Sequence, residues 1–140
     1  MINLFKKKNQ PEQNPKEPIT WPTHVTDLHQ KDFNEFVNKY PLSIIDFWAP
    51  WCNPCRTMLP RFRRLERVYQ GKVAFGRVNS EQNKEIADHY KIVGIPHFGV
   101  FSNGKKVGSI TGVKSVGAMK EQLELYLAKY TKQESPFGAN

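Results

Sequence analysis

A pair of cysteines, Cys52 and Cys55, directly follows a short apolar run, and this arrangement constrains the sequence more than any other feature. Residues 43–48 have the length and composition of a buried strand, and a helix is expected to begin near Cys52. A thiol at a helix N-terminus lies close to unpaired backbone N–H groups and the positive end of the helix dipole, so its pKa is lowered. Cys55 lies about one helical turn further on and can attack a mixed disulfide formed by Cys52. The spacing predicts a redox pair with Cys52 as nucleophile and Cys55 as resolving thiol.

Two other interpretations of the cysteine pair stay open at this point. A zinc site needs four ligands, but the chain has no third cysteine, and its four histidines do not supply a second pair at close ligand spacing. We therefore expect no bound metal. The other alternative is a static structural disulfide, although a chain of 140 residues can bury a core without one.

The net charge of +8 raises the possibility of a nucleic-acid partner. The distribution of the basic residues favours a solvated helix face over a nucleic-acid site. After the cysteines, apolar residues recur at spacings of four, three and four, namely Met58, Phe62, Leu65 and Tyr69. Arg56, Arg63 and Arg67 fall on the opposite face of the same predicted helix. We expect no nucleic-acid partner, although this basic surface could steer acidic protein substrates.

Composition predicts one globular domain at residues 21–131, with flexible segments at 1–20 and 132–140. Residues 1–20 combine three lysines with prolines and polar residues and have little apolar content. They lack the apolar core of a secretory signal, and no stretch approaches the roughly 20 apolar residues that span a bilayer. These features predict a soluble, cytoplasmic protein without a membrane partner, and we expect it to be a monomer.

Alternating strand and helix signals predict an α/β fold with a central mixed sheet and helices on both faces. Helices are expected at residues 30–39, 53–70 with a kink at Pro60, and 82–89, and a C-terminal helix is marked by Met119, Leu123, Tyr126 and Tyr130. Strands are expected at residues 42–48, 73–78, 98–101 and 106–110. Gly71 is expected to end the second helix. Asn103-Gly104 is a strong hairpin signal because both residues tolerate positive φ.

Residues 24–130 resemble the thioredoxin family. The resemblance rests on the run from Asp46 to Cys55, which contains Trp-Cys-x-Pro-Cys, and on Pro60, Gly94-Ile95-Pro96, Asn103-Gly104 and Gly112, all in the same order. It implies a thioredoxin fold, Cys52 as nucleophile, Cys55 as resolving thiol, and Pro54 stiffening the turn between them.

The resemblance also assigns Asp46 as a buried acid beneath the site. A desolvated carboxyl has a raised pKa and can accept or return the Cys55 proton through a water molecule. The alternative is a strand-end aspartate that faces solvent. Arg77 stands where thioredoxins often have a lysine paired with this acid, and it would lower the aspartate pKa persistently because arginine stays protonated. Trp48 is expected to pack under the site as core.

Pro96 is expected to be cis and to lie against the disulfide, although a plain turn proline is the alternative. The resemblance then implies that the Ile95 backbone pairs with an extended substrate segment. Trp51, Gly94 and Gly112 would complete a flat, partly apolar docking surface around Cys52.

Two residues depart from the common family pattern. Asn53 replaces the usual glycine and could change the hydrogen bonds to the Cys52 thiolate. His97 replaces the usual threonine and either adds a titratable group near the thiols or is a satisfied strand residue.

The implied activity is that of a thiol–disulfide oxidoreductase that reduces protein disulfides. It would cycle between a dithiol and the Cys52–Cys55 disulfide without a bound cofactor, and its electrons would come from a thioredoxin-reductase-like flavoprotein. The alternatives are a disulfide oxidase or isomerase of the same fold, and a binding module that uses Trp51 and Ile95 independently of thiol chemistry.

Overall fold

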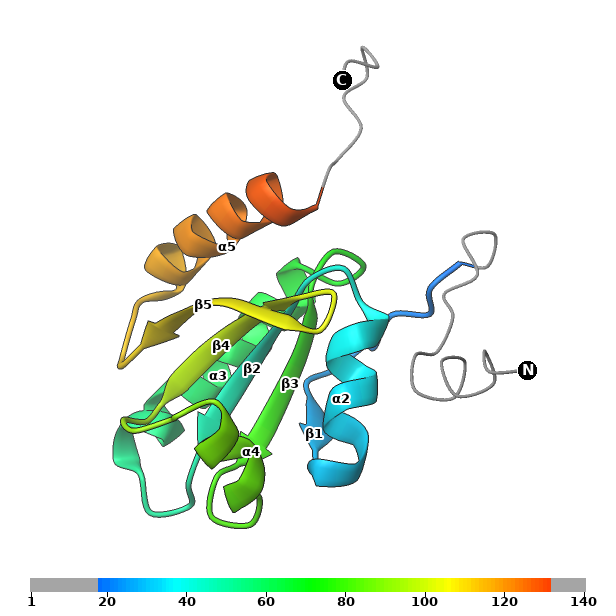
Figure 1. The fold of residues 1–140 in the computed structure, drawn as a ribbon. Coiled ribbons are helices and arrows are strands. Elements are labelled where there is room, and N and C mark those ends of the chain that lie inside the picture. Colours follow the sequence, from blue (N-terminus) through cyan, green and yellow to red (C-terminus); the bar gives the residue numbers. More distant parts are fainter. Residues whose placement is uncertain (1–17, 132–140) are drawn as a thin grey trace, which may run out of the picture.

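The apolar run that precedes the cysteines forms the central strand of a mixed five-stranded sheet. The computed structural model describes residues 18–131. Its strands are β1 (Thr26–Leu28), β2 (Ser43–Trp48), β3 (Ala74–Asn79), β4 (His97–Ser102) and β5 (Lys105–Thr111), and its helices are α2 (Gln30–Lys39), α3 (Asn53–Val68), α4 (Lys84–His89) and α5 (Val116–Tyr130). The strand order is β1-β3-β2-β4-β5, with β1, β3 and β2 parallel and with β4 antiparallel to both β2 and β5 (Figure 1). The predicted α/β thioredoxin fold with a mixed sheet is confirmed.

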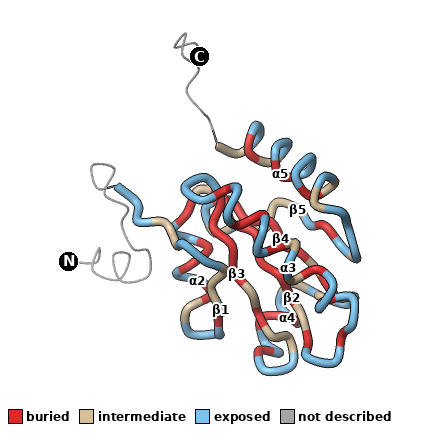
Figure 2. The backbone as a smooth tube through the Cα atoms, turned by 180° about the vertical axis from the view of Figure 1, so that it is seen from behind, coloured by how far each residue is buried: buried red, intermediate tan, exposed pale blue. Residues whose placement is uncertain are grey.

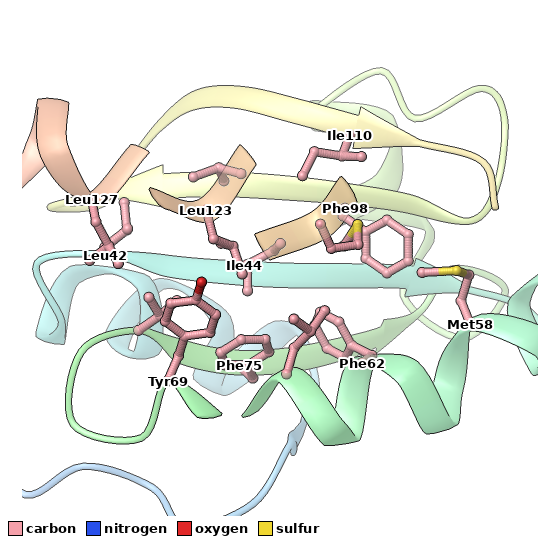
Figure 3. Close-up of a cluster of buried hydrophobic side chains, with 14 residues drawn as sticks. Leu42, Ile44, Met58, Phe62, Tyr69, Phe75, Phe98, Ile110, Leu123 and Leu127 are labelled. Atoms are coloured by element: carbon pink, nitrogen blue, oxygen red, sulfur yellow. The ribbon is translucent and has the colours of Figure 1, made fainter. Parts of the chain in front are cut away.

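Alternation along β2 divides the core into two layers, because neighbouring side chains of a strand point to opposite faces. Ile44 packs in a cluster with α3 and α5, and Ile45 packs in a cluster with α2 and α4. Helices therefore cover both faces of the sheet, and the buried positions concentrate along its central strands (Figures 1 and 2). On the α3 face the ring of Phe62 packs between Phe75 and Phe98, with centroid distances of 5.0 and 5.4 Å (Figure 3).

The strongest local signals give elements close to those predicted. Asn103 and Gly104 have φ values of 51° and 86° and form the two-residue loop between β4 and β5. Gly71 also has a positive φ of 82°, three residues after α3 ends. Pro60 lies within α3 without ending the helix, since the element runs from Asn53 to Val68.

Two details differ from the prediction. Strand β1 was not expected, because three residues are too few to show an alternating pattern and the strand is defined by its pairing with β3. In α5 the buried stripe consists of Met119, Leu123 and Leu127, whereas Tyr126 and Tyr130 are only half-buried.

Part of the predicted domain organisation falls outside the described residues. This holds for the predicted tail at 132–140 and for residues 1–17 of the predicted leader at 1–20. Within residues 18–131, none of the helices combines the length and the apolar character needed to cross a membrane.

Candidate active site

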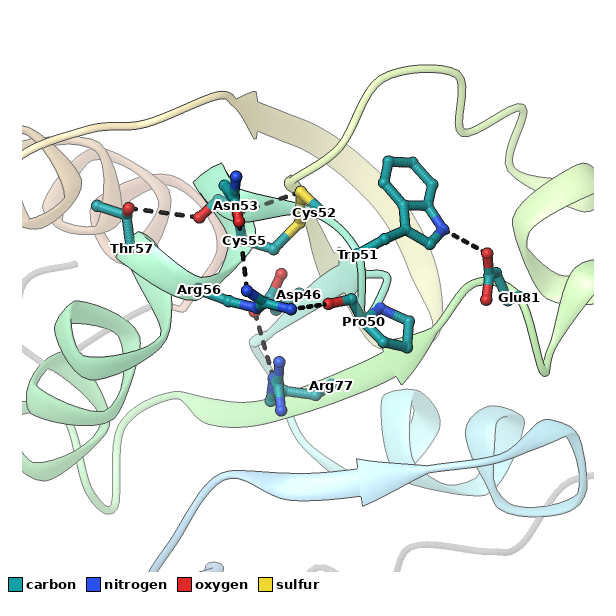
Figure 4. The surroundings of a disulfide bond; sticks show 10 residues. All are labelled: Asp46, Pro50, Trp51, Cys52, Asn53, Cys55, Arg56, Thr57, Arg77 and Glu81. Atoms are coloured by element: carbon teal, nitrogen blue, oxygen red, sulfur yellow. Dashed lines mark hydrogen bonds and ion pairs between the residues drawn. A yellow bond between two sulfur atoms is a disulfide. The ribbon is translucent and has the colours of Figure 1, made fainter.

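The cysteines occupy the junction between β2 and α3. Cys52 is the N-cap residue of α3, and its sulfur forms a disulfide with Cys55, whose Cα lies 5.3 Å from that of Cys52 (Figure 4). The Cys52 Sγ also accepts a hydrogen bond from the Cys55 backbone N–H at 3.2 Å. Pro54 stands in the first turn, where a helix needs no N–H donor. Cys52 therefore lies where backbone N–H groups favour a thiolate, as the sequence predicts.

Asp46 is completely buried on the same face of the sheet as α3. In the view of Figure 4 its carboxyl lies between the disulfide and Arg77. Desolvation raises the pKa of Asp46 from 3.8 to about 7, although the charge of Arg77 and its hydrogen bond act in the lowering direction. The Oδ1 atom of Asp46 has no hydrogen-bond partner among the described residues. The predicted buried placement is thus confirmed over the solvent-facing alternative, and burial outweighs the arginine.

Arg77 is held by two contacts with residues of the neighbouring strand β2. Its Nε donates to Asp46 Oδ2 at 3.4 Å, and its guanidinium lies 4.1 Å from the ring centroid of Trp48. Trp48 is half-buried, lies on the same face of the sheet as Asp46, and packs against the two cysteines. The aromatic ring and the carboxylate together hold the guanidinium, which offers a hydrogen-bond donor and a delocalised cation for these two contacts.

The surface beside the disulfide is formed by the loop that precedes β4. The Ile95–Pro96 peptide bond is cis, as predicted, and the Pro96 carbonyl accepts from the Gly112 N–H at 3.0 Å. Gly94 is exposed and Ile95 is half-buried. Among residues 18–131, no backbone hydrogen bond involves the N–H or the carbonyl of Ile95. The loop therefore presents free backbone groups next to the cysteines.

Trp51 projects from the site with 63% of its surface exposed. Its Nε1 donates to the carboxylate of Glu81, which follows β3 (Figure 4). Both residues line a pocket of about 270 Å³ together with Ile95, Val93 and Lys84. The predicted docking surface is thus hollowed on the side of α4 rather than flat. Sequence reasoning missed Glu81, Lys84 and Val93 because no local motif marks them.

No group of three or more histidine, cysteine or acidic side chains in the described part of the chain is arranged to hold a metal ion.

Comparisons with known proteins agree with this geometry. The family model described as Thioredoxin matches residues 24–125. Thioredoxin 1 of Nostoc sp. is 36% identical over 84 residues, which cover 60% of this chain and 78% of the relative. The chain belongs to the thioredoxin family. It is a thiol–disulfide oxidoreductase, and the predicted enzyme class, protein-disulfide reductase, is supported by the thioredoxins it resembles.

Other thioredoxins extend the comparison. The chloroplastic M-type thioredoxin of Spinacia oleracea is 34% identical over 105 residues, but the alignment spans only 58% of that relative and 74% of this chain. The structure of Plasmodium falciparum thioredoxin is 29% identical, has a TM-score of 0.68, and is matched over 99% of its length and 73% of this chain. A mutant thioredoxin from Halobacterium salinarum, at 23% identity, has a TM-score of 0.71 over 81% of this chain and 96% of its own, and supports the fold alone.

The two departures from the thioredoxin pattern have specific contacts. In this disulfide form, the Asn53 side-chain oxygen accepts from Arg56 at 3.3 Å, and the same arginine donates to the Pro50 carbonyl at 2.8 Å. Asn53 thus braces the loop that carries Cys52 instead of bonding to its sulfur.

His97 lies on the opposite face of the sheet from Asp46. It pairs with Phe47 across β2 and β4, contacts the Phe47 ring, and its Nε2 lies 2.9 Å from Lys106 Nζ. Burial, and secondly the charge of Lys106, lower the pKa of His97 from 6.5 to about 4. The imidazole is therefore neutral at pH 7, which favours the strand-residue interpretation over a charged group near the thiols.

Proposed function

We propose that this thioredoxin-family protein reduces disulfides in protein substrates, with Cys52 as nucleophile and Cys55 as resolving thiol. The single observation that carries the proposal is the position of Cys52 at the N-terminus of α3, with Cys55 one turn deeper and 1% exposed. The Cys52 thiolate would attack one sulfur of the substrate disulfide and release the other as a thiolate. Cys55 would then attack the Cys52 sulfur, which frees the second substrate thiolate and leaves the Cys52–Cys55 disulfide.

Asp46 is proposed to take the proton of Cys55 during the second step. A carboxyl with a pKa of about 7 exchanges protons readily near neutral pH, whereas an ordinary aspartate is too weak a base. Arg77 and Trp48 would act as positioning residues, because Arg77 contacts the carboxyl at 3.4 Å and its guanidinium lies over the Trp48 ring. Pro54 would keep the first turn of α3 in register with Cys52.

Substrates are proposed to bind along the loop at Gly94, Ile95 and Pro96. The unpaired backbone groups of Ile95 suit an extended segment that adds as a short strand. Trp51 lines the same pocket as Ile95, and Gly112 donates to the Pro96 carbonyl, so both would contact the residues around the substrate disulfide. Binding through backbone groups favours many different substrate sequences over one.

The dithiol must be restored after each turnover. We propose that a thioredoxin-reductase-like flavoprotein supplies two electrons and that no cofactor binds to this chain itself. We further propose that the protein acts as a monomer in the cytoplasm and that residues 21–131 are its functional unit. Cell fractionation checks the compartment, since the spinach relative is named as chloroplastic. Light scattering checks the monomeric state. The activity of a trimmed chain of residues 21–131 checks whether these residues are the functional unit.

Trapping of mixed disulfides tests the mechanism. The Cys55→Ser variant should retain substrates on Cys52, and a reducing agent should release them, because the resolving step is lost. The matched Cys52→Ser variant should retain none. Equal trapping by the two variants, or trapping by neither, would contradict the assignment of Cys52 as nucleophile. The reduction potential of the pair separates the alternatives: a potential below the cytosolic glutathione poise supports a reductase, and a markedly higher one indicates an oxidase or isomerase.

A further inference from the structure

A hollow lined by three arginines lies between β1 and α3, on the same face of the sheet as Asp46. It has a volume of about 300 Å³ and is lined by Arg63 and Arg67 of α3, Arg77 of β3, and His24 and Asp27 from the β1 segment. Arg63 and Arg67 are one helical turn apart, so they lie on the same side of α3. The hollow gathers positively charged groups from separate parts of the chain.

Arg63 and Arg67 are not neutralised by contacts with neighbouring side chains, whereas Arg77 is paired with Asp46. Neither Arg63 nor Arg67 has a carboxylate oxygen within 4.0 Å among residues 18–131. Both are exposed and have no hydrogen bond to another described residue. Their guanidinium groups are therefore available to a ligand.

Arg77 forms the inner wall of the hollow and is used only in part by the redox site. Its Nε donates to Asp46, and its guanidinium lies over the Trp48 ring. The two terminal amino groups make no hydrogen bond within the described chain, although the side chain is only 11% exposed. The terminal amino groups are not among the buried unpaired atoms of the described chain, so they reach the solvent of the hollow and are available to a ligand that accepts several hydrogen bonds.

Two carboxylates in the same lining restrict the class of ligand. Asp27 is exposed, and Glu66 is buried with its Oε1 accepting from Gln70 Nε2 at 3.3 Å. The three guanidiniums outnumber these two carboxylates, so the lining keeps a net positive charge and favours an anion that places its oxygens on the guanidiniums and away from the carboxylates. Guanidinium groups match the oxygens of phosphate in paired hydrogen bonds.

We propose that this hollow binds a small phosphate-type anion through Arg63, Arg67 and Arg77. The site is separate from the cysteines, and the proposal does not depend on the proposed function. It does predict an effect on the redox site, because an anion on the terminal amino groups of Arg77 offsets part of the charge that acts on Asp46. Binding should therefore raise the pKa of Asp46 further.

Titration of the oxidised, full-length protein with inorganic pyrophosphate at low ionic strength tests the site. Calorimetry and NMR should show saturable binding at one site. Arg63→Gln and Arg67→Gln should each weaken the affinity about tenfold, because each removes charge-assisted hydrogen bonds. Both positions are exposed, so the variants are expected to fold.

Arg64→Gln is the matched control, because Arg64 is exposed on the same helix but does not line the hollow. Its affinity should stay within about twofold of the parent chain, as expected for a change in general surface charge. Lack of saturation, or equal weakening by Arg64→Gln and Arg67→Gln, would overturn the proposal. Saturating pyrophosphate should also raise the Asp46 pKa, followed by carboxyl ¹³C shifts, and an unchanged titration would overturn the part assigned to Arg77.

Discussion

The buried carboxyl of Asp46 should make the folded protein less stable as the pH rises, and Asp46→Asn should remove this dependence. Burial raises the pKa of Asp46 from 3.8 to about 7 in the folded chain. Between these values the folded state holds a proton that the unfolded state has lost, so the free energy of unfolding falls as the pH rises. A difference of about 3 pKa units, at 1.36 kcal/mol each, corresponds to an upper value of about 4 kcal/mol.

Denaturant unfolding of both oxidised proteins from pH 3 to pH 9 measures this effect. Well below pH 3.8 the carboxyl is protonated in both states, so the parent chain has no ionisation cost there. The stability of Asp46→Asn relative to the parent should then increase up to about pH 7 and stay constant above it. Arg77 is the charged group in contact with the carboxyl in the described chain. A difference between the two proteins that is independent of pH would refute the reasoning.

Other substitutions test separate parts of the structure. Arg77→Gln removes the charge that lowers the Asp46 pKa, so that pKa should rise above about 7, and the pH dependence of mixed-disulfide resolution should shift upward with it. His97→Gln should leave the slope of reduction potential against pH unchanged between pH 6 and 8, because the pKa of His97 is lowered to about 4; an altered slope would show that His97 titrates there. Phe62→Ala should cost about 3–5 kcal/mol of unfolding free energy in chemical denaturation, because a completely buried ring is removed from between two others, and a loss below about 1 kcal/mol would contradict that packing.

The order of the elements could be predicted where the sequence carries strong local signals. The apolar residues of α3 recur with a helical period, and Asn103-Gly104 occupies the positive φ values that a two-residue hairpin loop requires. Strand β1 carries no such signal. Thr26–Leu28 is a strand only because β3 lies beside it, with Thr26 opposite Gly76, and this pairing joins residues about 50 positions apart. The position of β1 therefore depends on the assembled sheet and cannot be predicted from its three residues alone.

In the site, sequence could predict what depends on a short segment. Cys52, Cys55 and the buried Asp46 all lie within ten consecutive residues. Helix capping is enough to place the cysteines, whereas the burial of Asp46 was predicted through the family resemblance, because the segment alone left a solvent-facing aspartate open. The direction of His97 could not be predicted, because it depends on the register between β4 and β2. The contact of Trp51 with Glu81 spans 30 residues and likewise requires the folded chain.

Alternation along β2 separates the proton chemistry of the site from the surface proposed to bind substrates. Asp46 points to the α3 face, where Arg77 contacts it, whereas the pocket at Trp51 and Ile95 extends toward α4. No hydrogen bond in the described chain joins the two groups directly. A substitution at Lys84 in the pocket and one at Arg77 should therefore change the free energy of unfolding additively, as expected for sites without shared partners. This separation would allow the choice of substrate to change while Asp46, the acid proposed to serve Cys55, keeps the same surroundings.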